Sequence, residues 1–275
     1  MPRLRFDEIG YWSEVKIEIV KEYAKAYSTV IKAQPQNFRT VYIDAFAGPG
    51  KHFRKRTRET IEGSPIAALG IEPAFDEYYF IDIVSEKIDY LERLIGTREK
   101  VYFMKGDANI KLIEDVFPKS KYSDYKRALC LLDPYGLHLD WKILEISGAA
   151  KSIEIFLNFP VADMNRNVFW KNPEGVSDSD IFRMTRFWGD ESWRSAAYTT
   201  ETTLFQFEER TDNETIAEAF RMRLKNVAGF SYVPEPIPMR NDQGAVVYYL
   251  FFASPNENGA KIATSIFKKY RNMRA

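Results

Sequence analysis

The residues of this chain best suited to chemistry are four aspartates that each close or follow an apolar run: Asp44, Asp82, Asp107 and Asp133. The first lies in residues 41–50, where the apolar run leads into the turn Gly48-Pro49-Gly50. Glycine has no Cβ, so this turn lets bare backbone approach a ligand closely. A buried strand that ends in an acid and breaks into a Gly-x-Gly turn indicates a nucleotide-type cofactor site.

The turn does not match the dinucleotide pattern G-x-G-x-x-G, because Lys51, His52 and Phe53 follow it. An NAD-dependent oxidoreductase is therefore a weak alternative. A Gly-Pro-Gly turn can also be only a tight corner, and an isolated aspartate is more often a turn residue or a helix cap. Four acids at four successive strand ends fit that simpler explanation less well.

The elements expected around these acids alternate along the chain. Apolar runs predict buried strands at residues 40–46, 78–83, 100–104, 128–133 and 153–159. Helical patterns cover residues 12–33, 65–71, 85–95, 109–117 and 141–150. Ser64 is the expected cap of the second helix, with Pro65 at its first position. This alternation predicts right-handed crossovers and a doubly wound, mostly parallel sheet covered on both faces.

The last quarter of the chain breaks that rhythm. Residues 230–239 and 246–253 are strand-like and joined by a turn sequence at residues 241–244, which predicts an antiparallel hairpin. The fold expected is α/β, with a seven-stranded sheet that ends in this hairpin. The division expected is an amino-terminal helix and α/β core at 1–160, a helical insertion at 161–228, and a closing hairpin and helix at 229–275.

The insertion is rich in aromatic residues, and we expect it to lie over the carboxyl edge of the sheet. Most of its rings should form its own core, while one or two stack on an unpaired base. The rings considered are Phe169, Trp170, Phe182, Phe187, Trp188, Trp193, Phe205 and Phe207.

Ligands of such a fold lie beyond the carboxyl ends of the strands. Asp82 is then placed to accept hydrogen bonds from two ribose hydroxyls. Asp107, with Asn109 beside it, is placed to read an adenine amino group. Phe46, with the acid and glycines of the first turn, would complete the cofactor site.

The segment Asp133-Pro134-Tyr135 is the candidate catalytic loop. It is similar to the Asp/Asn-Pro-Pro-aromatic loop of amino-group methyltransferases, in which oxygens accept hydrogen bonds from the target amine and the ring stacks on the base. The chemistry would be positioning and electrostatics. Here the aromatic comes one residue early and Gly136 follows, so a tight turn without catalysis stays equally open. A cytosine-C5 mechanism needs a nucleophilic cysteine, and the single cysteine, Cys130, lies inside an apolar run.

A basic run follows the glycine turn. Residues 51–58 hold five cations, namely Lys51, Arg54, Lys55, Arg56 and Arg58. At the mouth of the pocket this loop could hold nucleic-acid phosphates, although charge runs are more often solvated surface.

Composition sets wider limits. The chain has 275 residues, 45% hydrophobic content and a formal net charge of zero, so any polyanion must be bound by local patches. One cysteine and two histidines argue against a disulfide framework or a metal site. No apolar run approaches the roughly 20 residues of a membrane span, and we expect a cytoplasmic protein.

Taken together, these motifs resemble those of class I S-adenosylmethionine (SAM) methyltransferases and, within them, the three-Cys-motif partner (TcmP) family. The resemblance rests on residues 42–50, 63–65, 106–109 and 132–136 and on Asn158-Phe159-Pro160. It implies a bacterial, archaeal or phage protein with a methyltransferase-like fold. Its gene often lies beside one for a three-cysteine, phage Gp37/Gp68-like protein related to radical-SAM enzymes.

The function expected is N-methylation of a nucleic-acid base with SAM as the cofactor. The alternative is a non-catalytic or regulatory partner of the three-cysteine protein, which the incomplete catalytic loop would suit. The sequence does not choose between DNA, RNA and protein substrates, and the oligomeric state stays open.

Overall fold

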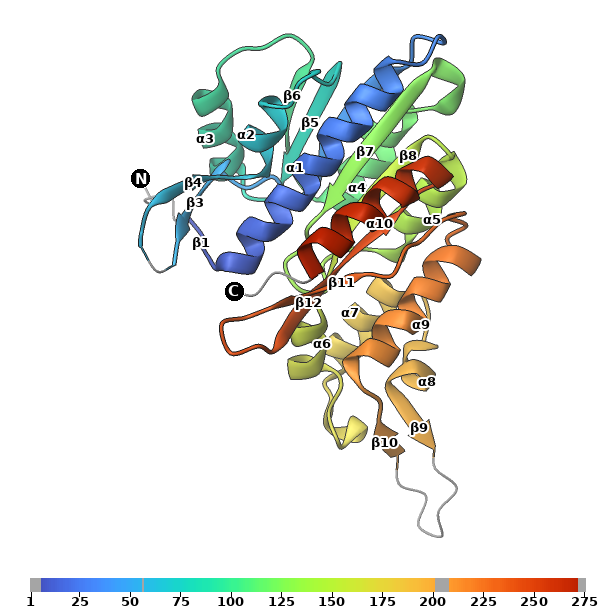
Figure 1. The fold of residues 1–275 in the computed structure, drawn as a ribbon. Helices are drawn as coiled ribbons and strands as arrows, with labels where there is room; N and C mark the ends of the chain where they lie inside the picture. Colours follow the sequence, from blue (N-terminus) through green and yellow to red (C-terminus); the bar gives the residue numbers. More distant parts are fainter. Residues whose placement is uncertain (1–5, 56, 201–207, 272–275) are drawn as a thin grey trace.

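A computed structural model of the chain describes residues 6–55, 57–200 and 208–271. Its centre is a seven-stranded sheet in the order β11-β12-β8-β7-β2-β5-β6 (Figure 1). The strands from β8 to β6 are parallel, β12 is antiparallel to β8, and β11 is antiparallel to β12. Their bounds are β2 Arg39–Asp44, β5 Glu77–Asp82, β6 Val101–Lys105, β7 Lys126–Leu132, β8 Ile153–Phe159, β11 Ile237–Arg240 and β12 Val246–Ala253. The expected α/β fold, a mostly parallel seven-stranded sheet closed by an antiparallel hairpin, is confirmed.

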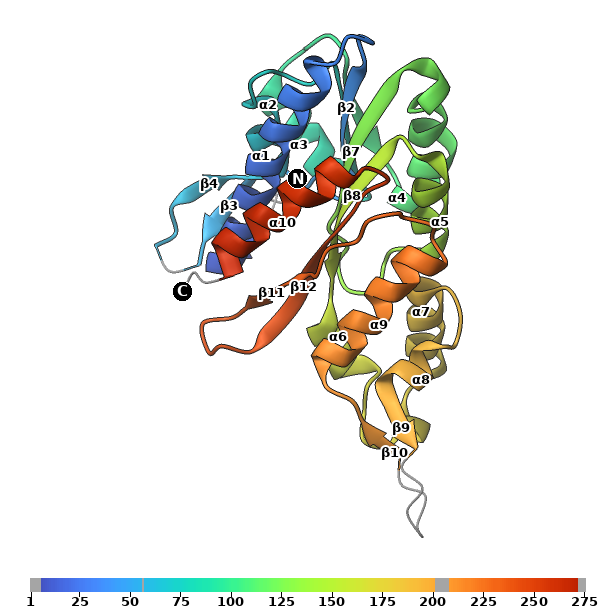
Figure 2. The same cartoon turned by 45° about the vertical axis from the view of Figure 1, so that its right-hand side comes forward.

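Helices cover both faces of this sheet (Figures 1 and 2). One face carries α1 (Tyr11–Lys32), α2 (Ser64–Leu69), α3 (Ser85–Ile95) and α10 (Glu257–Arg271); the other carries α4 (Ala108–Lys111) and α5 (Trp141–Ala150). Successive strand residues point to opposite faces and so supply the two cores. In β2, Tyr42 belongs to the core on the α1 and α10 side, and Val41 and Ile43 belong to the core on the α4 and α5 side. The near-continuous apolar strands of the sequence follow from this double burial.

Residues 161–228 form a lobe at the carboxyl end of β8 (Figure 2). It contains α6 (Val161–Asn167), α7 (Asp178–Trp188), α8 (Trp193–Ala197) and α9 (Asn213–Asn226), and also a small sheet of β9 (Tyr198–Thr200) and β10 (Glu208–Arg210). Phe220 of α9 packs on Phe159 and Phe251 of the main sheet, so lobe and sheet share one core. Of the rings singled out in the sequence, Phe169, Phe187, Trp188 and Trp193 are buried, and Trp170 and Phe182 are exposed. Phe205 and Phe207 lie outside the described residues.

The basic segment after the glycine turn is not a plain loop. It forms β3 (Lys51–Arg54) and β4 (Thr60–Glu62), and β3 also pairs with β1 (Glu8–Ile9) in a small separate sheet. The expectation of a loop was wrong because the run of charged residues has no apolar pattern that would predict strands. Arg54 binds Glu14 of α1, and this contact holds β3 against α1.

Three element ends also differ from expectation. The cap of α2 is Gly63 rather than Ser64, which is the first residue of the helix. The helix expected at 109–117 starts as α4, widens into a π-helical turn at Leu112–Val116 and tightens to a 3₁₀ turn at Phe117–Lys119. The first hairpin strand begins only at Ile237, since the preceding Pro234 and Pro236 have no N–H to give to a ladder.

None of the described helices has the length and apolar character needed to span a bilayer.

Candidate functional site

A cavity of about 500 Å³ lies where β2, β7 and β8 end, below the first turns of α1 and beside β3 and α6. Among its lining residues are five that the sequence singled out: Phe46, Gly48, Asp133, Pro134 and Tyr135. They come from the ends of β2 and β7, which are neighbours in the sheet, whereas Asp44, Gly50 and Asp82 are not among the residues that line the cavity. We call this cavity the strand-end pocket.

Asp44 ends β2 behind the strand-end pocket and is fully buried. Burial raises its pKa to about 7, with the charge of Asp133 adding to the rise, while the Ser64 hydroxyl and the Phe46 N–H favour the charged form. Its Oδ1 accepts the Phe46 N–H at 3.3 Å. Its Oδ2 is buried and has no hydrogen-bond partner in the described part of the chain. Asp44 is therefore an acceptor held close to its titration point at neutral pH.

Asp82, at the end of β5, fixes the glycine turn. Its Oδ2 accepts the Gly48 N–H at 2.9 Å and its Oδ1 accepts the Val84 N–H at 2.8 Å. Gly48 has φ +61, and a Cβ built there would meet nothing within 4 Å. Gly50 has φ +74, but a Cβ there would come within 2.5 Å of the Leu91 side chain. Gly48 thus presents open backbone, whereas Gly50 is needed for helix packing.

Asp133 follows β7 and has a partner on each carboxylate oxygen. Lys16 of α1 donates to Oδ2, and the Asn158 amide donates to Oδ1 at 2.7 Å. Burial opposes the charge on Lys16, but Asp133, Tyr248 and Asp44 together outweigh it, and the pKa of Lys16 is raised. A protein ammonium group therefore sits against the acid in which the sequence placed amine recognition.

Tyr135 stands at the mouth of the strand-end pocket, with 58% of its surface exposed. Its hydroxyl donates to Asp7 Oδ2 at 2.7 Å and accepts from Lys87 Nζ at 3.0 Å. The hydroxyl end is fixed, and Lys87 Nζ lies 5.1 Å from the ring centroid, so stacking on a base would use the ring face away from Lys87.

Asp107 and Asn109 are not among the residues that line this pocket. Asp107 caps α4 by accepting the Asn109 backbone N–H at 2.8 Å and its side-chain amide at 3.0 Å. Asn109 in turn accepts the Asp140 N–H at 2.8 Å. The pair braces α4 against residues 138–140, near the carboxyl end of β6.

Sequence reasoning gave no site role to Lys16, Asn158 or Asp163, which all line the strand-end pocket. Asn158 Oδ1 and Asp163 Oδ2 are both buried and have no hydrogen-bond partner among the described residues. The rule that picked out the four aspartates would also have found Asn158, since it lies next to last in β8. No sequence pattern marked Asp163 or Lys16, because their places depend on how α6 and α1 pack.

Two of the four described cations of the basic hairpin bind acids of α1 and β1. Arg54 binds Glu14 through Nε at 2.9 Å and Nη2 at 2.8 Å, and Arg58 lies 3.1 Å from Glu8. No ion pair is recorded for Lys51 or Lys55 within the described ranges, and Arg56 lies outside them. These lysines are the cations of the hairpin best placed to meet a ligand.

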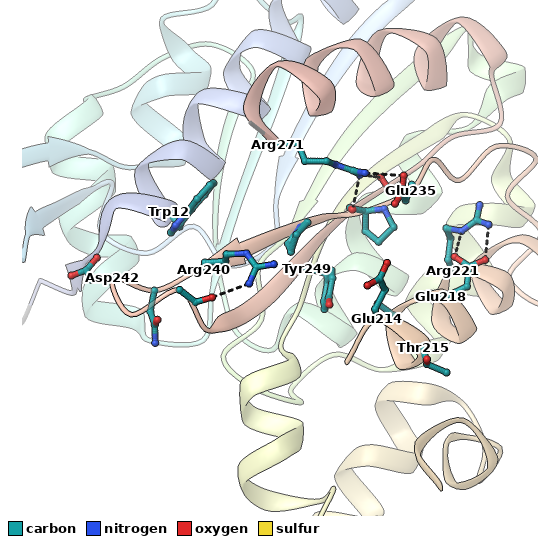
Figure 3. A pocket seen from close by; sticks show the side chains of 15 residues that line it. Trp12, Glu214, Thr215, Glu218, Arg221, Glu235, Arg240, Asp242, Tyr249 and Arg271 are labelled. Atoms are coloured by element: carbon teal, nitrogen blue, oxygen red, sulfur yellow. Dashed lines mark hydrogen bonds and ion pairs between the residues drawn. The ribbon is translucent and has the colours of Figure 1, made fainter. Parts of the chain in front are cut away.

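A larger groove, of about 1290 Å³, lies between α9, the β11–β12 hairpin and the end of α10 (Figure 3). Its charged side chains largely bind one another, as Arg221 does with Glu218 and Arg271 with Glu235. None of the four strand-end aspartates lines it. We therefore take the smaller strand-end pocket as the candidate site, because Asp133 lines it together with Gly48, whose N–H is held by Asp82.

In the part of the chain that the structure describes, no three His, Cys, Asp or Glu side chains come together in a group that could hold a metal ion.

No protein-family model and no curated protein sequence matches this chain. Solved structures resemble it in fold. A Legionella pneumophila protein, LPL1258 of family model DUF519, has a TM-score of 0.48 at 11% identity, over 93% of this chain and 92% of its own. A putative SAM-dependent methyltransferase from Listeria monocytogenes has a TM-score of 0.41 at 12% identity, over 85% and 99%. A SAM-dependent methyltransferase from Leishmania major has a TM-score of 0.39 at 10% identity, over 88% and 82%. Similarities this loose speak to the fold alone, so function must be argued from the residues of this chain.

Proposed function

We propose that this protein is a SAM-dependent methyltransferase whose target is an amino group of a nucleic-acid base. One observation carries the proposal: Asp82 holds the Gly48 N–H, a Cβ at this glycine would meet open space, and Asp44 Oδ2, at the end of the neighbouring strand, is buried without a hydrogen-bond partner among the described residues. That arrangement suits a ligand with a cationic head and a ribose.

The residues present fit such a cofactor. Asp44 Oδ2 would accept the ammonium of its amino-acid end, which is the partner that this buried oxygen lacks. Gly48 leaves space for the ligand, and Asp82 keeps acceptor capacity for ribose hydroxyls because a carboxylate has about four lone-pair sites. Asp107 and Asn109 would lie toward the adenine. When bound, SAM supplies a methyl group activated by its sulfonium.

The acceptor side of the proposal rests on the loop at Asp133, Pro134 and Tyr135. The exposed Tyr135 ring offers a stacking face for a base. Asp133 holds Lys16 and orients Asn158, and it retains lone pairs for a target amine. Lys51 and Lys55, with Arg56 in the same hairpin, would meet phosphates near the mouth.

Calorimetric titration with SAM and S-adenosylhomocysteine (SAH) tests the cofactor. We expect micromolar binding by the wild type and a loss of at least about tenfold in Asp82→Ala, since the mutation frees the glycine turn and removes the ribose acceptor. Asp178→Ala, an exposed aspartate of α7, is the matched control and should bind normally. Absence of SAM and SAH binding by the folded wild type would refute the proposal.

Transfer of a labelled methyl group to mixed DNA and RNA tests the reaction. Asp133→Ala should lower transfer by at least about a hundredfold, because the pocket loses both the Lys16 and the Asn158 contact. If that variant methylates as well as the wild type, the role given to this loop is wrong.

The second candidate is a non-catalytic or regulatory partner of a three-cysteine-motif protein, as the TcmP resemblance implies. The observation that favours it is the closed Lys16–Asp133–Asn158 network, which occupies the acid of the presumed catalytic loop. Co-purification of the two chains decides: a stable complex that transfers no methyl group, with the free chain also inactive, supports this candidate over the first.

A further inference from the structure

Two residues that line the strand-end pocket, Asn158 and Asp163, each have one side-chain oxygen that accepts no hydrogen bond from the described residues. Asn158 donates its amide Nδ2 to Asp133 at 2.7 Å, which fixes the amide so that Oδ1 is left as an acceptor. Asp163 accepts from Asn167 on Oδ1 at 2.9 Å, which leaves Oδ2 as an acceptor. Both remaining oxygens are buried and unpartnered in the described structure, and such an atom is costly to leave without a donor.

Close packing holds Asp163 in place. Gly136, in the loop after β7, has φ +56, and a Cβ there would lie 2.6 Å from Asp163 Oδ2. The loop backbone therefore presses against this carboxylate, and a side chain at Gly136 would displace it. The site is built around two acceptors whose orientations their neighbours set.

We infer that Asn158 Oδ1 and Asp163 Oδ2 are the specificity-determining acceptors for a neutral exocyclic –NH₂ of the target base. This inference rests on the proposed methyl transfer and deepens it, because it assigns recognition of the amine to residues other than Asp133. An –NH₂ has two N–H donors, one for each free oxygen. Asp133, already bound to Lys16 and Asn158, is a positioning residue in this scheme.

Charge and shape favour a base over a lysine side chain. The other acids of the lining lie in ion pairs: Asp7 with Lys87, Glu8 with Arg58 and Asp133 with Lys16. The exposed Tyr135 ring and the exposed Arg166 at the same pocket would serve a flat ring and a phosphate. A lysine side chain would find its charge repelled by Arg166, and Lys87 Nζ already lies 5.1 Å from the centroid of the Tyr135 ring, where a second ammonium would bind.

The test uses fluorescence anisotropy with labelled single-stranded oligothymidylates that contain one central adenine, cytosine or unsubstituted purine, in the presence of SAH. Thymine and purine have no amino group. We expect the wild type to prefer the adenine or cytosine probe over the purine probe by about tenfold. Asp163→Asn should reduce the preference to less than about threefold, because an amide can turn its NH₂ toward the target.

Asn158→Ala removes the other acceptor and should have the same effect, which guards against a folding defect peculiar to one variant. Asp178→Asn, the same substitution at an exposed position of α7, should keep the preference. Thermal unfolding of each variant establishes that it is folded. Equal binding of all probes by the wild type, no binding of any probe, or an undiminished preference in Asp163→Asn and Asn158→Ala would overturn the inference.

Two further arms separate the possible failures. SAH calorimetry on the same proteins tests methyl-donor binding: without SAH binding the proposed function fails, whereas SAH binding without amine preference refutes only the inference. Tighter binding of a lysine-containing peptide than of any oligonucleotide would show that the acceptors serve an alkylammonium group and would overturn the assignment to a base.

Discussion

Asp44 has a raised pKa, and its Oδ2 accepts no hydrogen bond from the described residues. Its carboxyl has a pKa of about 7 because burial penalises the charge, so it is about half protonated at neutral pH. Only the ionised form can pair with a cofactor ammonium. Ligand affinity and proton release should therefore be linked at this residue.

SAH affinity should accordingly rise by about tenfold between pH 6 and pH 7.5 and then level off, since the ionised fraction of Asp44 grows over that range. In Asp44→Asn the affinity at pH 7.5 should fall and the slope should vanish. Calorimetry at several pH values measures both. His52, whose pKa is lowered chiefly by burial, also lines the pocket, and His52→Asn should keep the slope. A flat profile in the wild type would contradict the role of Asp44.

The two glycines of the turn predict a contrast between binding and stability. Gly48→Ala places a methyl group in open space, so it should lower the unfolding free energy by about 1 kcal/mol through backbone strain alone. The same change should weaken SAH binding by at least about tenfold, because the methyl group enters the cofactor position.

Gly50→Ala adds a clash with Leu91 to the same strain and should cost more than about 2 kcal/mol of stability. Chemical denaturation and SAH calorimetry separate the two effects. If both variants lose stability equally and bind normally, the assignment of Gly48 to the ligand is mistaken.

Among the elements, the β3–β4 hairpin offers two kinds of cation. Arg54 ties the hairpin to α1 through Glu14, while Lys51 and Lys55 have no recorded ion pair in the described ranges. If the hairpin binds phosphates, the lysines should carry the salt dependence. The double variant Lys51→Gln/Lys55→Gln should reduce the slope of log K against log salt by about 1.4 on single-stranded nucleic acid, or about 0.7 per contact.

The matched control is Lys142→Gln/Lys261→Gln, which removes two exposed lysines that are paired on other helices. If the slope falls equally for both double variants, the change comes from the lower net charge of the protein and not from phosphate contacts of the hairpin.

The helices and strands also show which parts of the fold could be predicted from the sequence and which could not. Long apolar runs predicted the strands that carry Asp44, Asp82 and Asp133, since their burial on both faces leaves an unambiguous pattern. The π-helical turn after α4 and the pairing of β1 with β3 left no such trace, because each depends on contacts with distant residues. Asp163 escaped notice for the same reason: α6 turns its carboxylate toward Gly136 only in the folded chain.

At the scale of the whole molecule, a second buried carboxyl group makes the free energy of unfolding depend on pH. Glu154 of β8 is fully enclosed; burial raises its pKa to about 7 against the opposing effect of hydrogen bonds from Tyr23 and Ser254. Between the ordinary glutamate pKa of 4.5 and about 7, the folded chain holds a proton on Glu154 that the unfolded chain has lost. The free energy of unfolding should thus fall as pH rises through this window, by about 1.4 kcal/mol per pH unit for this group, and flatten above it.

Glu154→Gln removes that titration, so its stability profile should be flatter than that of the wild type by this amount. Denaturant unfolding from pH 4.5 to pH 8 measures it. Asp44, whose pKa is also about 7, contributes a similar slope, and Asp44→Asn tests that share separately. Parallel profiles of Glu154→Gln and the wild type would show that Glu154 is ionised in the fold.

The prolines around β11 have a consequence for how copies of this chain can meet. β11 is one margin of the main sheet, and Pro234, Pro236 and Pro238 give it no N–H at those positions. A neighbouring molecule cannot extend the sheet there with a regular ladder. Growth through joined main sheets would have to start from β6 at the other margin, and pairing through that single margin of the described sheet would stop at two molecules instead of running on into a fibre.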